Sequence, residues 1–140
     1  MAANDFVLAY QPVLTGMVAV KNTDGVNINS GDLVKMDVAN PLSATVPFLC
    51  VVRAGAVTDS PVFVAIDNIL QLKSGRVAVA GPIARCVASA AIVVNAAVTA
   101  TAAGQAVTKG AGNPQFGWAL TPAANAGDQI LVLMTSAANA

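Results

Sequence analysis

Short runs of Val, Ile, Leu and Thr, separated by Gly and Pro, make up most of the chain. Residues 33–38 place Val34, Met36 and Val38 at every second position, and residues 62–66 repeat this alternation. Side chains that recur with a period of two lie on one face of a β-strand. Many short strands bounded by turn residues predict an all-β fold.

Two further runs, residues 48–52 and 130–134, are apolar at every position. Continuous runs of this length are typical of strands that are covered on both faces. We therefore expect each of them to lie in the core or beneath a neighbouring subunit. Residues 87–103 fit two structures, because their alanines permit a short helix whereas residues 92–94, Ile-Val-Val, favour a strand.

The turns carry a repeated pattern of a small residue, a glycine, a polar residue, any residue and an aliphatic residue. It occurs at residues 30–34, 103–107 and 126–130, and each copy predicts a turn that begins a strand. The irregular spacing indicates repeated turn chemistry rather than a solenoid. The pair Asp24 and Gly25 predicts a tight hairpin, because glycine accepts the positive φ that such a turn requires.

This pattern predicts a small β-barrel or β-sandwich with an extended N-terminal arm and at most one short helix. We expect the arm to span residues 1–16 and a single β domain to span residues 17–140. A chain of 140 residues is long enough to bury one core and too short for two comfortable ones.

Residues 1–16 differ from the rest of the chain, because Phe6, Leu8 and Tyr10 fall on one face of an extended segment. The segment is either an edge strand of the domain or an arm that reaches a neighbouring subunit, and we favour the arm. An arm without a core of its own gains stability only where a partner covers it. The predicted interface residues are Phe6, Leu8, Tyr10 and Val13.

Charge is scarce: 10% of the residues are charged, against about 25% in an average soluble protein, and seven bases balance seven acids. Such a surface requires either lipid or extensive cover by partners. The longest uncharged stretch, residues 86–108, could span a bilayer, but it is rich in Ala and interrupted by Ser89, Asn95 and Gln105. We therefore expect no membrane and a surface that is buried in an assembly.

Two further expectations concern location and nucleic acid. Residues 1–5 contain no basic segment followed by an apolar one, so we expect no secretion signal and synthesis in the cytoplasm. Nucleic-acid binding relies on clustered Lys and Arg, whereas the seven bases of this chain are scattered. Nucleic acid is therefore not an expected partner.

Most catalytic chemistry has no residues to perform it. Histidine and glutamate are both absent, which removes Ser-His-Asp and Cys-His arrangements and the usual imidazole base. Two cysteines 36 positions apart, Cys50 and Cys86, lack the ligand number and paired spacing of a zinc site. We therefore expect a protein that is not an enzyme and has no cofactor.

One loop offers oxygens that a calcium ion could use, from Asn22, Asp24, Asn27, Asn29 and Asp32. The alternative is that Asn and Asp simply favour turns. We prefer the turn, because the spacing matches no calcium loop and only two of the five side chains are charged.

Three side chains are expected in the core. Cys50 and Cys86 lie in apolar runs and are interpreted as buried, reduced thiols, with a disulfide between them as the alternative. Trp118 is interpreted as an anchor of the core rather than a contact residue.

Several segments, taken in order, resemble the small capsid decoration (cement) proteins of tailed phages. They are a glycine-bounded strand at residues 75–81, an A-G-x-x-V turn at 103–108, a G-x-A-L strand at 116–120 and an A-G-D-x-I-x-V strand at 126–133. The turn at residues 31–34 resembles the early turn of that family.

This resemblance implies a compact β-barrel or sandwich, usually a homotrimer, on the exterior of the virion. It implies that the major capsid protein is a partner and that neighbouring capsid subunits are locked together against internal DNA pressure. It carries no catalytic residues. The alternatives are a tail, fibre or surface-layer structural subunit and, less favoured, a carbohydrate-binding module.

Overall fold

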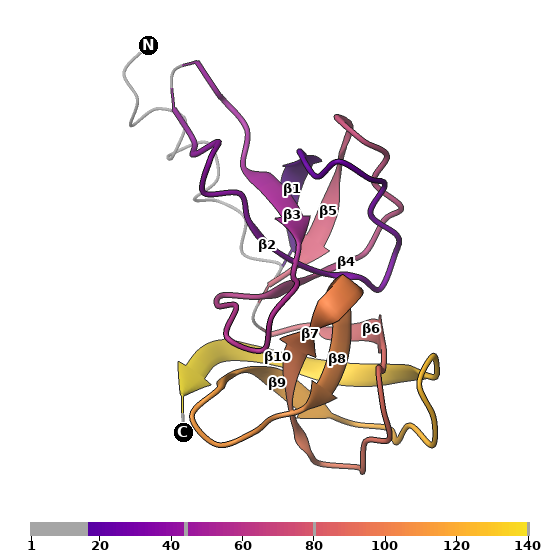
Figure 1. Ribbon diagram of the computed structural model, residues 1–140. Coiled ribbons are helices and arrows are strands. Elements are labelled where there is room, and N and C mark those ends of the chain that lie inside the picture. The colour runs from indigo at the N-terminus through magenta and orange to yellow at the C-terminus, as the bar shows by residue number, and fades with distance from the viewer. Residues whose placement is uncertain (1–16, 44, 80, 140) are drawn as a thin grey trace.

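The computed structural model describes residues 17–43, 45–79 and 81–139, and it confirms the predicted all-β fold (Figure 1). The predicted arm of residues 1–16 lies outside the described residues. No helix in the described part is long and apolar enough to cross a membrane. The elements are β1 Met17–Asn22, β2 Leu33–Met36, β3 Cys50–Arg53, β4 Phe63–Ala65, β5 Ser74–Ala78, β6 Ile83–Val87, β7 Ala97–Thr101, η1 Ala102–Gly104, β8 Gln105–Thr108, β9 Pro114–Ala119 and β10 Gln129–Asn139.

Strands β1 to β5 form a closed barrel in the order β1-β3-β2-β4-β5, with β5 antiparallel to β1. Only β1 and β3 of the barrel pair in parallel. Seven buried side chains fill the barrel: Val20, Ile28, Val34, Val51, Ala65, Ile69 and Val77. The barrel therefore has a core of its own.

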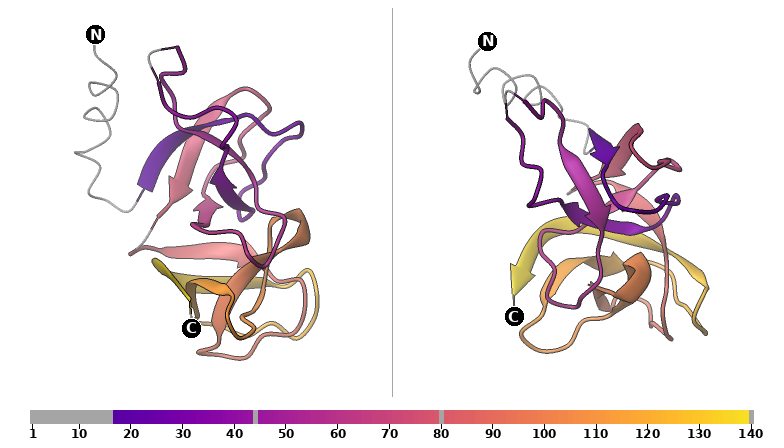
Figure 2. Two further views of the ribbon diagram at one scale, coloured as in Figure 1. Left: turned by 60° about the vertical axis from the view of Figure 1, so that its left-hand side comes forward. Right: turned by 45° about the horizontal axis from the view of Figure 1, so that its top comes forward.

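Strands β6 to β10 form a second sheet in the order β6-β10-β9-β7-β8. Its edge strands approach each other at one end, where Ala88 and Ala106 form a parallel bridge and Ser89 N donates to Ala106 O at 2.8 Å. The second sheet is therefore curled toward closure without completing it. It lies below the barrel in Figure 1, and both views of Figure 2 show the two stacked on each other.

The barrel and the second sheet follow the same strand path. In each, the first strand neighbours the third and fifth, and the second neighbours the third and fourth. The loops before the second and fifth strands are also joined alike. Ile28 and Ile69 exchange backbone hydrogen bonds of 2.9 and 2.7 Å, and Ile92 and Ala123 exchange two of 2.9 Å. Strands β1–β5 therefore correspond, in order, to β6–β10.

The correspondence extends to individual turns. The carbonyl of Asn22 accepts a hydrogen bond from Leu72 N, and that of Ala88 accepts one from Gly127 N, both at 2.8 Å. Leu72 and Gly127 both have positive φ, 63° and 92°. A left-handed residue therefore precedes the fifth strand in both halves, although only one of the two is glycine.

One pair of interior positions, one in a loop and one on a strand, carries its large and small side chains in opposite order in the two halves. A Cβ on Gly75, the second residue of β5, would overlap the side chain of Ile69. The corresponding residues of the second sheet are Ile130, second in β10, and Ala123. The large residue sits in the loop in one half and on the strand in the other, so each interior is filled.

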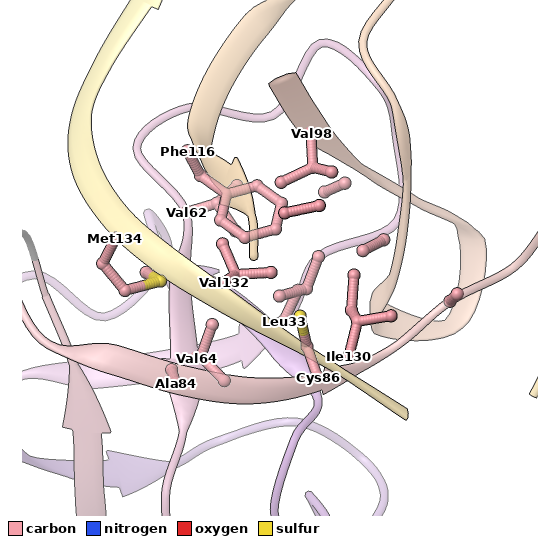
Figure 3. Close-up of a cluster of buried hydrophobic side chains, with 14 of the residues drawn as sticks. Leu33, Val62, Val64, Ala84, Cys86, Val98, Phe116, Ile130, Val132 and Met134 are labelled. Atoms are coloured by element: carbon pink, nitrogen blue, oxygen red, sulfur yellow. The ribbon is translucent and has the colours of Figure 1, made fainter. Parts of the chain in front are cut away.

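The second sheet covers one outer face of the barrel. Leu33, Val64 and Ala78 belong to barrel strands, yet they are buried in one cluster with Ile130 and Val132 of β10. Figure 3 shows Leu33 and Val64 beside these two side chains. A single hydrophobic cluster therefore joins the barrel to the second sheet.

Glycine turns behave largely as predicted. Gly31, Gly104 and Gly127 all have positive φ, 95°, 70° and 92°, just before β2, β8 and β10. The hairpin predicted at Asp24 and Gly25 is wrong, because Gly25 has no positive φ and β1 pairs with β3 and β5 instead of β2.

Within the ambiguous stretch of residues 87–103, residues 97–101 form the strand β7, whereas residues 92–94, which favoured a strand, lie outside it and contribute only the isolated bridge between Ile92 and Ala123. The only helical turn in the described residues is η1, a single 3-10 turn. The division into an arm of residues 1–16 and one domain of residues 17–140 stays a prediction.

Candidate interaction surface

Three large apolar side chains form a row across the outer side of the second sheet. Leu133 on β10 lies directly opposite Ile83 on β6 and Trp118 on β9. Residues opposite each other on adjacent antiparallel strands have their Cβ atoms about 4.5–5.5 Å apart, so the three side chains are neighbours. Their exposed fractions are 60% for Ile83, 37% for Leu133 and 44% for Trp118.

A second apolar pair lies beside this row. Leu131 is 43% exposed and Leu120 is 37% exposed, and Leu120 N donates to Leu131 O at 2.8 Å. We call the five residues Ile83, Trp118, Leu120, Leu131 and Leu133 the outer face. Large apolar patches on a soluble chain mark sites of interaction.

One charged side chain, Arg85, borders the outer face, opposite Leu131. Its guanidinium donates to Gln129 Oε1 at 3.2 Å and to Ser30 Oγ at 3.4 Å. Arg85 therefore already has neutral partners at the edge of the face.

The outer face follows from the sequence of β10. Ile130, Val132 and Met134 are buried in the core, while Leu131 and Leu133 between them point outward. The run 130–134 was expected to be covered on both faces, and in the isolated chain only its inner face is covered. The core therefore buries alternate residues of the run, and Leu131 and Leu133 have no cover from this chain.

The prediction that Trp118 is a core anchor is wrong. Its neighbours Gly117 and Ala119 are buried, and a Cβ on Gly117 would overlap the side chain of Val132. Because adjacent residues of a strand point to opposite faces, Trp118 faces outward. The small size of its neighbours was the sequence signal for this orientation.

The barrel carries a separate apolar patch at one end, formed by loop residues Val26, Leu70 and Leu72, which are 43%, 55% and 62% exposed. We call these three residues the barrel tip. Buried Asn22 links the two loops, since its Nδ2 donates to the carbonyls of Val26 and Ile69, both at 2.9 Å.

Backbone N–H groups bind several oxygens of the loop that was weighed as a calcium site. Asp24 Oδ2 accepts Arg53 N at 2.8 Å, and Asp32 Oδ2 accepts Asn29 N at 2.9 Å. Asn27 Oδ1 accepts a backbone hydrogen bond in the same way. These contacts support the turn interpretation. In the described residues, no group of three or more His, Cys, Asp or Glu could hold a metal ion.

Both cysteines are buried and free, as expected for reduced core thiols. Burial raises the pKa of the Cys86 thiol to about 12 and also raises the pKa of Cys50. A thiol with a raised pKa is a poor nucleophile at neutral pH. The two thiols therefore act as packing residues in this fold.

Several carboxylates fasten loops. Asp59 Oδ2 accepts Gly55 N and Ala56 N at 2.8 and 2.9 Å, and Lys35 Nζ lies 3.0 Å from its Oδ1. Burial raises the pKa of Asp59, but the hydrogen bonds from Gly55, Lys35 and Ala56 outweigh it and lower the pKa overall. Asp59 therefore serves as a turn residue that fastens the loop before β4.

The predicted interface residues Phe6, Leu8, Tyr10 and Val13 lie outside the described residues, so their role stays a prediction. The structure instead brings together the outer face, of which the sequence indicated only the apolar run 130–134 and Trp118.

No protein-family model and no curated protein matches the chain. Among solved structures, the chain is similar to the head fiber gp8.5 N base of bacteriophage phi29, with a TM-score of 0.65 and 17% identity. The match covers 85% of this chain and 94% of the other. At this identity the likeness shows that the two chains share a fold.

Proposed function

We propose that the chain is a structural protein of a phage virion that binds the outer surface of the capsid and stabilises it by bridging major capsid subunits. The observation that carries this proposal is the fold that the chain shares, over 85% of its length, with the base of a phage head fiber. Fold alone does not determine function, so the surface must support the proposal as well.

The surface supports an assembly role in two ways. The outer face exposes five large apolar side chains on one side of a sheet. In addition, only 10% of all residues are charged, and cores of protein interfaces are depleted in charge. A homotrimer that contacts several capsid subunits would gain avidity without any single strong contact. In this proposed function the protein catalyses no reaction and requires no cofactor.

A fibre subunit is the alternative that the same likeness favours, because the similar structure is itself the base of a head fiber. The two functions differ in their assembly. A fibre or surface-layer subunit grows into filaments or sheets by itself, whereas a decoration protein stays a small oligomer until capsids are present.

The test is binding to capsids of the phage that encodes the chain, measured by co-sedimentation. We expect saturable binding at a fixed ratio to the major capsid protein and a higher temperature of capsid disruption. Capsids of an unrelated phage serve as the control. An absence of binding to the matching capsids, or growth of the purified chain into filaments, would contradict the decoration function.

A further inference from the structure

The outer face occupies a position that is covered in the other half of the fold. In the barrel, Ala78 on β5 lies opposite Val64 on β4, and Val64 lies opposite Leu33 on β2. These three residues are at most 1% exposed, because inward side chains of the second sheet, among them Ile130 and Val132, share one buried cluster with them. In the barrel, this row on the outer side is therefore completed by side chains from another part of the chain.

The corresponding row of the second sheet belongs to the outer face. Leu133 is fifth in β10, as Ala78 is in β5, and Trp118 is last but one in β9, as Val64 is in β4. The row of the second sheet is exposed, yet it carries the larger side chains. A strand face that meets only water usually carries polar residues, so this row has the composition of a covered one.

A neighbouring position strengthens this comparison. Arg76 of the barrel, third in β5, is exposed and its guanidinium forms an ion pair with Asp67 at 2.9 Å. Its counterpart, third in β10, is Leu131, which is 43% exposed. The fold therefore accommodates a charged pair at this position, and the second sheet has leucine there instead. The composition of the outer face fits an apolar occupant.

Arg85, at the border of the outer face, calls for an acidic group in that occupant. It is exposed, its guanidinium donates only to neutral Gln129 and Ser30, and it takes part in none of the ion pairs among the described residues. Arg85 lines two cavities, one of about 290 Å³ beside Ile83 and one of about 410 Å³ beside Leu131. An occupant with one acidic side chain next to several large apolar ones would therefore match this border and the face.

The sequence before β1 has this composition. Asp5 is the only charged side chain before Lys21, and it directly precedes Phe6, Leu8 and Tyr10, which alternate on one face of the predicted extended segment. A carboxylate forms strong, directional hydrogen bonds with a guanidinium. Asp also favours turns, so Asp5 can end the extended segment and direct its carboxylate toward the border while the apolar residues cover the row.

The place where this segment joins the domain, together with its length, favours the outer face of a neighbouring copy. Met17, the first residue of β1, lines the same cavity as Ile83 and Arg85, so the segment leaves the domain beside its own outer face. Asp5 lies twelve positions before Met17. Fully extended, this stretch spans about 40 Å, which is about the diameter of a domain of this size. An extended segment therefore carries Asp5 one subunit away from its own Arg85.

We propose that residues 1–16 of one copy bind the outer face of the next copy. Asp5 pairs there with Arg85, and the apolar residues that follow it cover the row that contains Trp118. Each copy donates one segment and accepts another, so the contact is heterologous and can close into a ring, which agrees with the homotrimer proposed above. The inference deepens the proposed function and rests on it only in treating the chain as a subunit of an assembly.

Reversing the charge on each side of the proposed pair tests the contact, with the native mass measured by light scattering over a range of concentrations. Asp5→Lys and Arg85→Glu should each raise the concentration of half-dissociation at least about tenfold, because each places like charges together. The double variant restores opposite charges and should return to within about threefold of the wild type.

Lys73→Glu is the matched control for the charge reversals, because Lys73 is an exposed base that lies off the outer face. It should leave the half-dissociation concentration unchanged. A monomeric wild type, or a double variant that dissociates as readily as the single ones, would overturn the proposal.

Trp118 gives a second readout, because it is the single tryptophan of the chain. Leu8→Glu should yield a monomer of 13.9 kDa whose fluorescence emission is shifted to the red of the wild type. Val7→Glu, on the opposite face of the extended segment, should keep the wild-type mass and emission. Both substitutions precede β1, so they test the contact even if Arg85→Glu fails to fold. Equal effects of the two, or an emission maximum that ignores dissociation, would overturn the proposal.

Cross-linking distinguishes a neighbouring copy from the chain's own outer face. The double variant Phe6→Cys, Ile83→Cys is treated with a short bifunctional thiol reagent, while the native Cys50 and Cys86 are buried at 1% and 0% exposure. We expect linked products of two and three chains on a denaturing gel. A link within one chain, or no link at all, would overturn the proposal.

Capsid co-sedimentation of the same variants separates this inference from the proposed function. If the charge-reversal pair restores the oligomer and the wild type does not bind capsids, the proposed function fails and the inference stands. If Leu8→Glu stays oligomeric but no longer binds capsids, residues 1–16 contact the capsid, and the inference is overturned while the proposed function stands.

Discussion

The side-chain amide of Asn22 donates a hydrogen bond to the carbonyl of Ile69, 47 positions further along the chain. The same nitrogen donates to Val26 O, and Asn22 Oδ1 accepts Asp24 N at 2.8 Å. Asn22 is 0% exposed, and its bond to Ile69 O is buried, whereas its bonds with Val26 O and Asp24 N are partly buried. This side chain therefore joins the two loops that carry the barrel tip.

Asn22→Ala should lower the free energy of unfolding by about 2–3 kcal/mol, because it removes three hydrogen bonds of a fully buried side chain. Urea denaturation followed by circular dichroism measures the change. The control is Asn125→Ala, an exposed loop residue, which should change stability by less than about 0.5 kcal/mol. Equal effects of the two substitutions would mean that the amide does not stabilise the barrel.

Gly104 lies where the second sheet meets the barrel. It has φ +70°, and a Cβ would lie 3.0 Å from Leu33 O. Gly104→Ala should therefore combine the left-handed backbone cost of about 1–2 kcal/mol with a steric cost. Gly112→Ala is the control, because Gly112 has φ +79° and open space around its Cβ position. The difference in unfolding free energy between the two variants measures the steric cost of a Cβ beside Leu33 O. Equal losses would show that the backbone at the junction moves to accommodate the methyl group at no cost.

The exchanged pair of large and small side chains predicts strong coupling. Gly75→Ile alone should overpack the barrel, and Ile69→Ala alone should leave a cavity that costs about 2–4 kcal/mol. The double variant reproduces the arrangement of Ile130 and Ala123. It should lose at least about 1 kcal/mol less than the sum of the single losses, as measured by a double-mutant cycle. Additive losses would contradict the correspondence of the two interiors.

Carboxylates should make the fold sensitive to acid. The pKa of Asp59 is lowered in the folded chain, as described above, and Arg76 lowers the pKa of Asp67. A group whose folded pKa is depressed stabilises the fold above its unfolded pKa of about 4, and this contribution is lost as the pH falls through the folded value. The melting temperature should therefore fall between about pH 5 and pH 2.

Asp59→Asn should flatten this fall, since it removes one titrating group. Asp32 should contribute a pH dependence of stability with the opposite sign, because burial raises its pKa. Its carboxylate therefore disfavours the fold at neutral pH relative to acid, and Asp32→Asn should steepen the loss of stability on acidification. A melting temperature that does not depend on pH in any of these chains would contradict the predictions.

Local sequence patterns predicted strands and turns well, because they depend on side-chain period and on backbone freedom within a few residues. Gly31, Gly104 and Gly127 illustrate this, since each begins a strand as expected. The hairpin predicted at Gly25 was wrong because a hairpin depends on which strands pair, and pairing is decided by contacts between residues far apart in the sequence.

The duplicated strand path was not visible in the sequence, for a physical reason. Leu72 and Gly127 adopt the same backbone conformation with different side chains. Ile69 and Ala123 differ because compensating changes on the facing strands keep both interiors filled. Packing volume and backbone shape are shared between the two halves, and residue identity is not.

The outer face was only half predictable. The unbroken apolar run 130–134 predicted cover on both sides of its strand, and the structure shows cover on the inner side alone. Trp118 was misplaced, because an isolated tryptophan is usually buried, whereas here Gly117 and Ala119 take the inward positions. Ile83 and Leu120 carried no signal without knowledge of the strand order.

Because one cysteine is buried in each half, thiol labelling can measure the local opening of each half separately. Cys50 lies in the barrel and Cys86 in the second sheet, at 1% and 0% exposure. A thiol reagent reaches each of them only when its surroundings open, so two labelling rates report two opening equilibria in one molecule. Equal rates would mean that the shared hydrophobic cluster makes both halves open together. Unequal rates would rank which half yields first when the protein is warmed or strained.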